Sequence, residues 1–200
     1  MFGNCYRYRP RVFPDPVEAA GTILDESQRL TEVVNGLLML SRLENHLTAI
    51  ELNPIQVVEI TSDCLGRRDT LAMQKGISLS LNEEDGEAFA MGRGELLESV
   101  LNNLLANAIR YAKEHVSVTV RSEGSHVLVP VADDGPGIAP EDLPHIFERF
   151  FTGPGGNSGL GLAIAQGAAH YMGGTLTAAN REEGGAIFTL SLQAAPPSGS

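Results

Sequence analysis

Two asparagines and an arginine share one face of the most clearly helical segment of the chain, residues 94–113. Asn103 and Asn107 are four residues apart and Arg110 follows three later, so their side chains project on a common side. Asparagine is a mediocre helix former, so two on one face of a helix call for a reason. Amide oxygens suit Mg²⁺, and a guanidinium one turn further can hold a phosphate oxygen. The alternative is that these polar groups simply face water.

Two carboxylates end an expected strand in the segment "VADDGPGI". Asp133 and Asp134 are followed by a sharp turn through Gly135, Pro136 and Gly137. A buried carboxylate there could accept a hydrogen bond from the exocyclic amine of adenine, whereas the carbonyl of guanine would leave it unpaired. Glycines would let the backbone come close to a flat ligand. An ordinary Asp-Gly turn is the alternative.

A glycine-rich run, "TGPGGNSGLGLAIAQGAAHYM", precedes the last expected helix, residues 159–172. The first amides of a helix are free to bind an anion, which predicts that this run serves a phosphate chain. It is not a Walker loop, because no Gly-Lys-Ser/Thr follows. Just before it, Phe147, Phe150 and Phe151 surround Glu148 and Arg149, where aromatic core packing competes with a hinge for a mobile flap.

The expected order of helices and strands around these residues predicts an α+β fold. Helices are expected at 54–74, 94–113, 140–150 and 159–172, with strands at 76–83 and 87–92 and hairpins at 115–134 and 174–193. The mixture indicates a two-layer α/β sandwich, with a mixed, largely antiparallel sheet covered by helices on one face and preceded by a long helix. Pro130, inside an expected strand, favours an edge or a bulge there.

The preceding helix carries two apolar rows. Ile23, Leu30 and Leu37 recur every seven residues, and Val33 and Leu40 belong to a second row. Two apolar faces indicate either a helix of a bundle or an ordinary core helix, with nothing to separate the two. The expected division is a flexible leader at 1–16, this partial helical unit at 17–48, one domain at 50–193 and a disordered tail at 194–200.

The composition narrows the class of protein. A net charge of −11 argues against a nucleic-acid surface, and a hydrophobic fraction of 42% supports a real core. Cys5 and Cys64 form no CxxC pair, so a disulfide framework or zinc site has no support and a reducing cytoplasm is expected. No apolar run is long enough to cross a bilayer, so membrane association would come through a partner or an upstream segment.

These segments, in this order, resemble the ATP-binding domain of sensor histidine kinases, in the wider group that includes gyrase. "LNNLLANAIRY" resembles the N box of that family, "DDGPGI" the G1 box, "IFERFF" the F box and "GLGLAI" the G2 box. The resemblance implies ATP and Mg²⁺ as cofactors, with the metal on Asn107 and Asn103, phosphate on Arg110 and adenine on Asp133. The nucleotide-binding set that it implies is Asn103, Asn107, Arg110, Tyr111, Asp133, Gly135, Gly137, Ile138, Arg149, Gly159, Leu160, Gly161 and Leu162.

The phosphoacceptor half of such a kinase is missing from this sequence. Residues 17–46 are similar to the second helix of the family's dimerisation hairpin, but none of the five histidines is followed by Asp or Glu. The resemblance therefore implies no certain catalytic residue here and a phosphoacceptor His on a separate chain or a missing segment. It also implies a downstream response regulator and a homodimer or heterodimer through the N-terminal helix.

Two departures keep rival functions open. The segment between Phe151 and Gly159 lacks the Arg or Lys often found there, which allows a non-catalytic nucleotide-binding scaffold. Two other rivals are disfavoured: hydrolysing clamps of the gyrase kind, and serine kinases of the anti-sigma kind, usually carry a Glu one turn before the metal-binding Asn. This chain has Asn103 there, so water activation would lack its general base. The family also usually has Asn in place of Asp134.

Overall fold

A five-stranded sheet carries the architecture. The computed structural model describes residues 27, 30–31, 33–34, 36–38, 41, 51–84, 87–153 and 158–196. In the sheet the strands run β2 (Ser78–Glu83), β4 (His115–Glu123), β5 (His126–Asp133), β7 (Ala186–Gln193) and β6 (Thr175–Asn180). Only the β2–β4 pair is parallel, which agrees with the mixed, largely antiparallel sheet predicted from the sequence.

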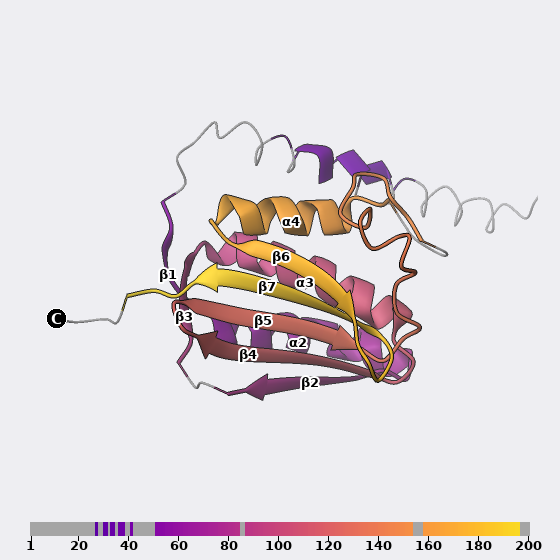
Figure 1. Cartoon of the computed structure of the whole chain (residues 1–200), viewed down its shortest axis with the longest axis horizontal. Coiled ribbons are helices and arrows are strands. Elements are labelled where there is room, and N and C mark those ends of the chain that lie inside the picture. The colour runs from indigo at the N-terminus through magenta and orange to yellow at the C-terminus, as the bar shows by residue number, and fades with distance from the viewer. Residues whose placement is uncertain are drawn as a thin grey trace, which may run out of the picture.

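Three helices cover one face of this sheet: α2 (Val57–Gln74), α3 (Gly94–Tyr111) and α4 (Gly161–Tyr171) (Figure 1). The α3 helix buries a stripe at helical spacing, made of Leu97, Val100, Leu101, Leu104, Leu105 and Ala108. The sheet contributes every second side chain of β4 to this core. Val116, Val118 and Val120 are fully buried, while Ser117 and Thr119 between them are not. These two patterns together form the core of the predicted two-layer sandwich.

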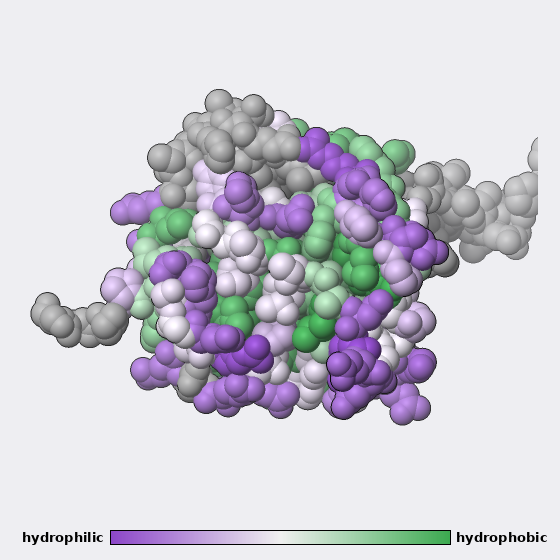
Figure 2. All heavy atoms as spheres, viewed as in Figure 1, coloured by the Kyte–Doolittle hydropathy of each residue, from purple (hydrophilic) through white to green (hydrophobic). Residues whose placement is uncertain are grey.

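The opposite face of the sheet is more polar. Outward positions of β4 carry Ser117, Thr119 and Arg121. Figure 2, drawn in the view of Figure 1, shows hydrophilic and neutral side chains over much of this face, with small apolar patches between them. One face is therefore packed and the other solvated, as expected for a largely antiparallel sheet.

A second sheet has two strands, of which one was predicted from the sequence at 87–92 and the other was not. Antiparallel strands β1 (Asn53–Gln56) and β3 (Phe89–Gly92) pair beside the main sheet. The segment expected to be helical from residue 54 is therefore extended until α2 begins at Val57. At the other end of the domain, the backbone N–H groups of Ala194 and Ala195 donate to the carbonyls of Ser125 and Phe89, both at 2.8 Å. Ordered pairing thus reaches two residues beyond the expected boundary at 193.

Two further local differences have physical reasons. Residues 140–150, expected as a short helix, form successive turns instead, with hydrogen bonds such as His145 N to the Asp142 carbonyl at 2.8 Å. Pro130 lies in β5, a central strand, and pairs with Thr189 of β7. Its missing N–H faces β4, where the pairing lapses between Val118↔Val131 and Arg121↔Leu128.

The described residues between 27 and 41 are helical, which agrees with a helix ahead of the domain; the rest of the leader and of this expected helix lies outside the described residues. Val33 packs against the buried pair Leu160 and Ala163 at the start of α4, and Gly36 is buried there. A second face, bearing Leu30, Val34, Leu37 and Leu38, is exposed. Among the described helices, none combines the length and apolar character that crossing a membrane requires.

Candidate functional site

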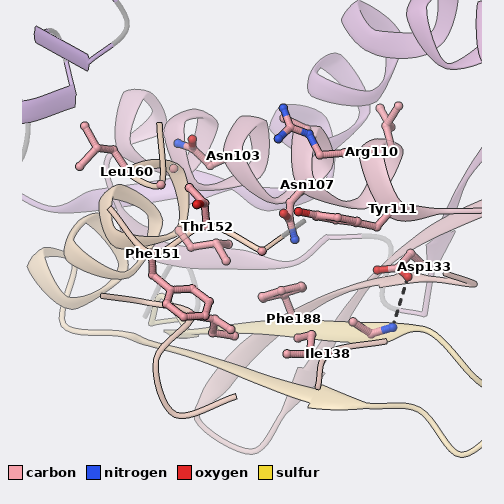
Figure 3. Close-up of a pocket in the computed structure, with 18 of the residues that line it drawn as sticks. Asn103, Asn107, Arg110, Tyr111, Asp133, Ile138, Phe151, Thr152, Leu160 and Phe188 are labelled. Atoms are coloured by element: carbon pink, nitrogen blue, oxygen red, sulfur yellow. Dashed lines mark hydrogen bonds between the residues drawn. The ribbon is translucent and has the colours of Figure 1, made fainter. Parts of the chain in front are cut away.

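One cavity of about 1310 Å³ gathers most of the residues that the sequence singled out. It lies between α3, the turn after β5 and the start of α4 (Figure 3). The expected site residues that line it are Asn103, Asn107, Arg110, Tyr111, Asp133, Gly137, Ile138, Gly159, Leu160, Gly161 and Leu162. Segments that are up to 59 residues apart in sequence are thus assembled around a single volume.

Two expected residues do not line this cavity. Gly135 is buried behind it, and its N–H donates to Asp133 Oδ1 at 2.8 Å, so it acts on the cavity through that carboxylate. Arg149 is exposed in the turn segment before Phe150. A direct role of Arg149 in binding stays a prediction.

Asp133 is a buried carboxylate at the end of β5, with 3% of its surface exposed. Its Oδ1 accepts hydrogen bonds from the N–H groups of Gly135 at 2.8 Å and Ala186 at 3.3 Å. Burial raises the pKa of this carboxyl, and the two N–H groups only partly oppose that shift. In Figure 3 its other oxygen points toward the cavity. The arrangement presents a fixed acceptor to a ligand that carries an N–H donor.

The neighbouring Asp134 has a different task. Its Oδ1 accepts from the backbone N–H groups of Lys113 at 2.8 Å and Glu114 at 3.2 Å. Desolvation alone would raise its pKa, but backbone hydrogen bonds from His115, Glu114 and Lys113 together hold that pKa below its usual value. Asp134 therefore ties the turn after β5 to the chain that leaves α3, while Asp133 faces the cavity.

The α3 wall presents polar groups along the cavity. Figure 3 shows the Asn107 amide directed into it, with the ring of Tyr111 extending alongside and Thr152 nearby. Arg110 projects on the outer side of the helix. Asn107 and Tyr111 are four residues apart, so the helix itself sets their spacing.

Asn103 joins α3 to the start of α4. Its Nδ2 donates to the Ser99 carbonyl at 2.8 Å, which turns the amide oxygen toward Gly161. A Cβ placed on Gly161 would stand 2.8 Å from Asn103 Oδ1, so any larger residue would have to displace the amide. A small residue at the first position of α4 is therefore required for the two helices to meet here.

The start of α4 can receive an anion. No side chain caps the first turn of this helix among the described residues, and that turn has no acidic residue. The chain that leads to it is closed by a hydrogen bond from Phe150 N–H to the Gly159 carbonyl at 2.9 Å. Uncapped N–H groups and the helix dipole favour negative charge at this place.

The α2 side of the cavity was not foreseen. Arg68, Leu71 and Lys75 line it from that helix. Burial lowers the pKa of Arg68, and in the described part of the chain its Nε is a buried donor with no hydrogen-bond partner. Sequence alone offered no signal for this wall, because the packing of α2 beside α3 decides which residues reach the cavity.

The polar groups fit a nucleotide with Mg²⁺. Amide oxygens of Asn103 and Asn107 are hard donors, and Mg²⁺ usually completes its shell with waters and phosphate oxygens rather than a cage of side chains. In the described residues no group of three or more His, Cys, Asp or Glu side chains is placed to hold a metal ion. The donor set therefore suits a metal that arrives with phosphate.

Comparisons with known proteins agree with this geometry. Residues 92–196 match the family model "Histidine kinase-, DNA gyrase B-, and HSP90-like ATPase". The chain is 36% identical over 179 residues to the sensor histidine kinase RppB of Synechocystis sp., which covers 86% of this chain and 39% of RppB. It is 33% identical over 183 residues to the histidine-protein kinase AfsQ2 of Streptomyces coelicolor, covering 89% of this chain and 33% of AfsQ2.

Solved structures give the same answer. The crystal structure of full-length ShkA in complex with AMPPNP superposes with a TM-score of 0.79 at 27% identity, covering 91% of this chain and 40% of that one. The chain thus spans well under half the length of these relatives. The order of its motifs and its sheet with helices on one face agree with these similarities. The chain therefore belongs to the family of histidine kinase-, DNA gyrase B- and HSP90-like ATPases, as a relative of the sensor histidine kinases.

Proposed function

We propose that this chain is the ATP-binding catalytic part of a two-component histidine kinase. It would transfer the γ-phosphate of ATP to a His carried by a separate chain or by a further segment. The observation that carries the proposal is one cavity with a buried carboxylate at one end and two amides beside an uncapped helix start at the other. A response regulator would act downstream, in the cytoplasm.

The residues divide the nucleotide between them. The carboxylate of Asp133 accepts a hydrogen bond from the exocyclic amine of adenine, and Ile138 and Phe188 supply the apolar surface for the base. The first N–H groups of α4 would receive phosphate oxygens, and Arg110, which lines the cavity but projects on the outer side of α3, would turn its side chain inward to join them. Asn107, assisted by Asn103, would hold Mg²⁺, which when bound neutralises charge on the phosphates. Catalysis in this scheme is alignment and charge stabilisation.

The acceptor must come from outside the described residues. His115, His126, His145 and His170 lie among them, and none lines the cavity. The exposed apolar face at Leu30, Val34, Leu37 and Leu38 supports the proposal that a second helix, from another chain or segment, completes the hairpin there.

A hydrolysing clamp is the less favoured alternative. It needs a general base beside the metal ligand, and Asn103 stands at that position. Among the described residues that line the cavity, Asp133 and Asp142 are the carboxylates, and Asp133 is engaged with Gly135 and Ala186. A nucleotide-binding scaffold without transfer stays open because no Arg or Lys stands between Phe151 and Gly159.

The test mixes the purified chain with γ-labelled ATP, Mg²⁺ and candidate hairpins that carry a His followed by an acidic residue. The expected result is acid-labile label on the hairpin, absent when its His is replaced by Gln. Steady release of free phosphate with no labelled protein would favour the hydrolysing clamp. Binding of ATP with neither product would favour the scaffold.

A further inference from the structure

The turn after β5 is held by a residue that the nucleotide motifs do not include. Asn180, the last residue of β6, exchanges two hydrogen bonds with Ile138. Its Oδ1 accepts from the Ile138 N–H at 2.7 Å, and its Nδ2 donates to the Ile138 carbonyl at 2.7 Å. The side chain thus grips the main chain of Ile138 as a neighbouring strand would.

The residue next to Asn180 holds the other end of the same turn. Arg181 Nη1 donates to the main-chain carbonyl of Asp133 at 3.0 Å, and its Nη2 pairs with Glu183 at 3.2 Å. Figure 1 shows the β6–β7 turn beside the end of β5. Two adjacent residues of one hairpin therefore bracket residues 133–138.

Gly137 has the conformation that this grip requires. Its φ is +81°, and a Cβ there would lie 2.8 Å from Asn180 Oδ1. A side chain at residue 137 would be strained by its backbone angle and would also displace the amide of Asn180. The glycine allows the hairpin to approach closely enough to bond the next residue.

We propose that Asn180, supported by Arg181, is a positioning residue for the nucleotide base, acting through the main chain of Ile138. Ile138 and Asp133 line the cavity, whereas Asn180 and Arg181 do not, so the hairpin supports the base wall from outside the cavity. The inference rests on the proposed function, since it assumes that the base lies between Ile138 and Asp133. Without the grip the turn would have to be ordered again each time a nucleotide binds.

The first experiment compares Asn180→Ala with Asn82→Ala, a matched change at an exposed Asn on β2. The dissociation constant for AMPPNP should rise about tenfold in Asn180→Ala, because two net hydrogen bonds no longer hold the wall in place, and stay at the wild-type value in Asn82→Ala. In the transfer assay the KM for ATP should rise while kcat changes little. Hydrogen exchange of the Ile138 amide should accelerate in Asn180→Ala alone.

Two further variants separate positioning from simple stability. Asn180→Asp keeps an acceptor for the Ile138 N–H but sets a carboxylate against the Ile138 carbonyl, so it should not restore affinity. Arg181→Ala should also weaken AMPPNP binding, whereas Arg121→Ala is its control, since Arg121 forms a similar pair with Glu123 at 3.7 Å on β4. A melting temperature is recorded for every variant.

The outcomes are distinct. Weaker AMPPNP binding with a faster Ile138 amide supports the inference. Unchanged binding in Asn180→Ala and Arg181→Ala, with the wild type binding normally, overturns it while the proposed function stands. A lower melting temperature with unchanged AMPPNP affinity overturns it as well, because it assigns the two residues to stability alone. A wild type that does not bind AMPPNP at all removes the proposed function and this inference with it.

Discussion

The carboxylate of Asp133 accepts a hydrogen bond from the backbone N–H of Ala186 at 3.3 Å, so the end of β5 and the start of β7 together form the base end of the cavity. The two residues are 53 positions apart in the chain, and the sheet order brings them side by side. The same carboxylate has a raised pKa because it is buried. The ionised carboxylate therefore destabilises the folded state, which is common for charged groups at functional sites.

Asp133→Asn should change stability and affinity in opposite directions. Because the folded pKa of Asp133 is raised above the ordinary carboxyl value of 3.8, the ionised group disfavours folding once the pH exceeds that value. The neutral amide removes this cost, so the melting temperature at pH 7 should equal or exceed that of the wild type. The gain should shrink as the pH falls toward 3.8 and the wild-type carboxyl is protonated in both states.

In the same variant, ATP affinity should fall roughly 10- to 100-fold, because the amide that faces the adenine amine offers a donor where an acceptor is needed. Calorimetric titration measures the affinity and scanning calorimetry the melting temperature. Loss of both affinity and stability would show that the acid serves the fold and not the base.

Asp134→Asn should show the opposite pH dependence of stability. The folded pKa of Asp134 lies below the ordinary carboxyl value of 3.8, so its stabilisation is present above that value and is lost as the pH falls through the folded pKa. At pH 7 the variant should be less stable by less than about 1 kcal/mol, since Asp134 is only partly buried and solvent screens its charge. Urea unfolding at pH 7 and near pH 2.5 checks this, and a constant difference between the two pH values would refute it.

Asn107→Asp should abolish Mg²⁺-dependent phosphoryl transfer. A carboxylate in place of the amide alters both the charge and the geometry of the metal site beside the triphosphate. The loss should exceed the ~10- to 100-fold seen when only an outer partner of a metal ligand is removed. Melting should change little, because the side chain faces the cavity. Full transfer activity in the variant would contradict the assignment of Asn107 to the metal.

Phe188→Ala should weaken the fold and the base wall at once. Phe188 is 1% exposed and also lines the cavity. Its ring meets that of Phe147 edge-on, with 6.5 Å between the ring centroids. Its truncation should cost about 3–5 kcal/mol of unfolding free energy. Guanidinium unfolding measures it, and Ile187→Ala, on the adjacent and partly exposed position of β7, is the matched control. An equal loss in both variants would mean that Phe188 is not part of the core.

Periodicity made much of this fold predictable. The α3 stripe from Leu97 to Ala108 and the alternating valines of β4 follow directly from helical and strand repeats. Strand β1 was hidden because Ile55 and Gln56 run without a break into the apolar start of α2. Pro130 suggested an edge or a bulge; it lies in central β5, where a proline is tolerated because the pairing with β4 lapses beside it.

The candidate site was predictable where one element holds several of its residues. The helical repeat of α3 placed Asn103 and Asn107 along the cavity, but Arg110, expected on the same face, projects on the outer side of the helix. Contacts between distant segments were not predictable, because the order of the strands and the packing of α2 decide them. Arg68 at the α2 wall and Asn180 behind the base wall belong to that class.

Titration of the purified wild-type chain with ATP and with GTP, both in Mg²⁺, tests the central claim most directly. A cavity in which Asp133 reads the adenine amine should bind one equivalent of ATP and bind GTP at least tenfold more weakly, because guanine offers a carbonyl at that edge. Equal affinity for the two nucleotides, or no binding of ATP, would contradict the account.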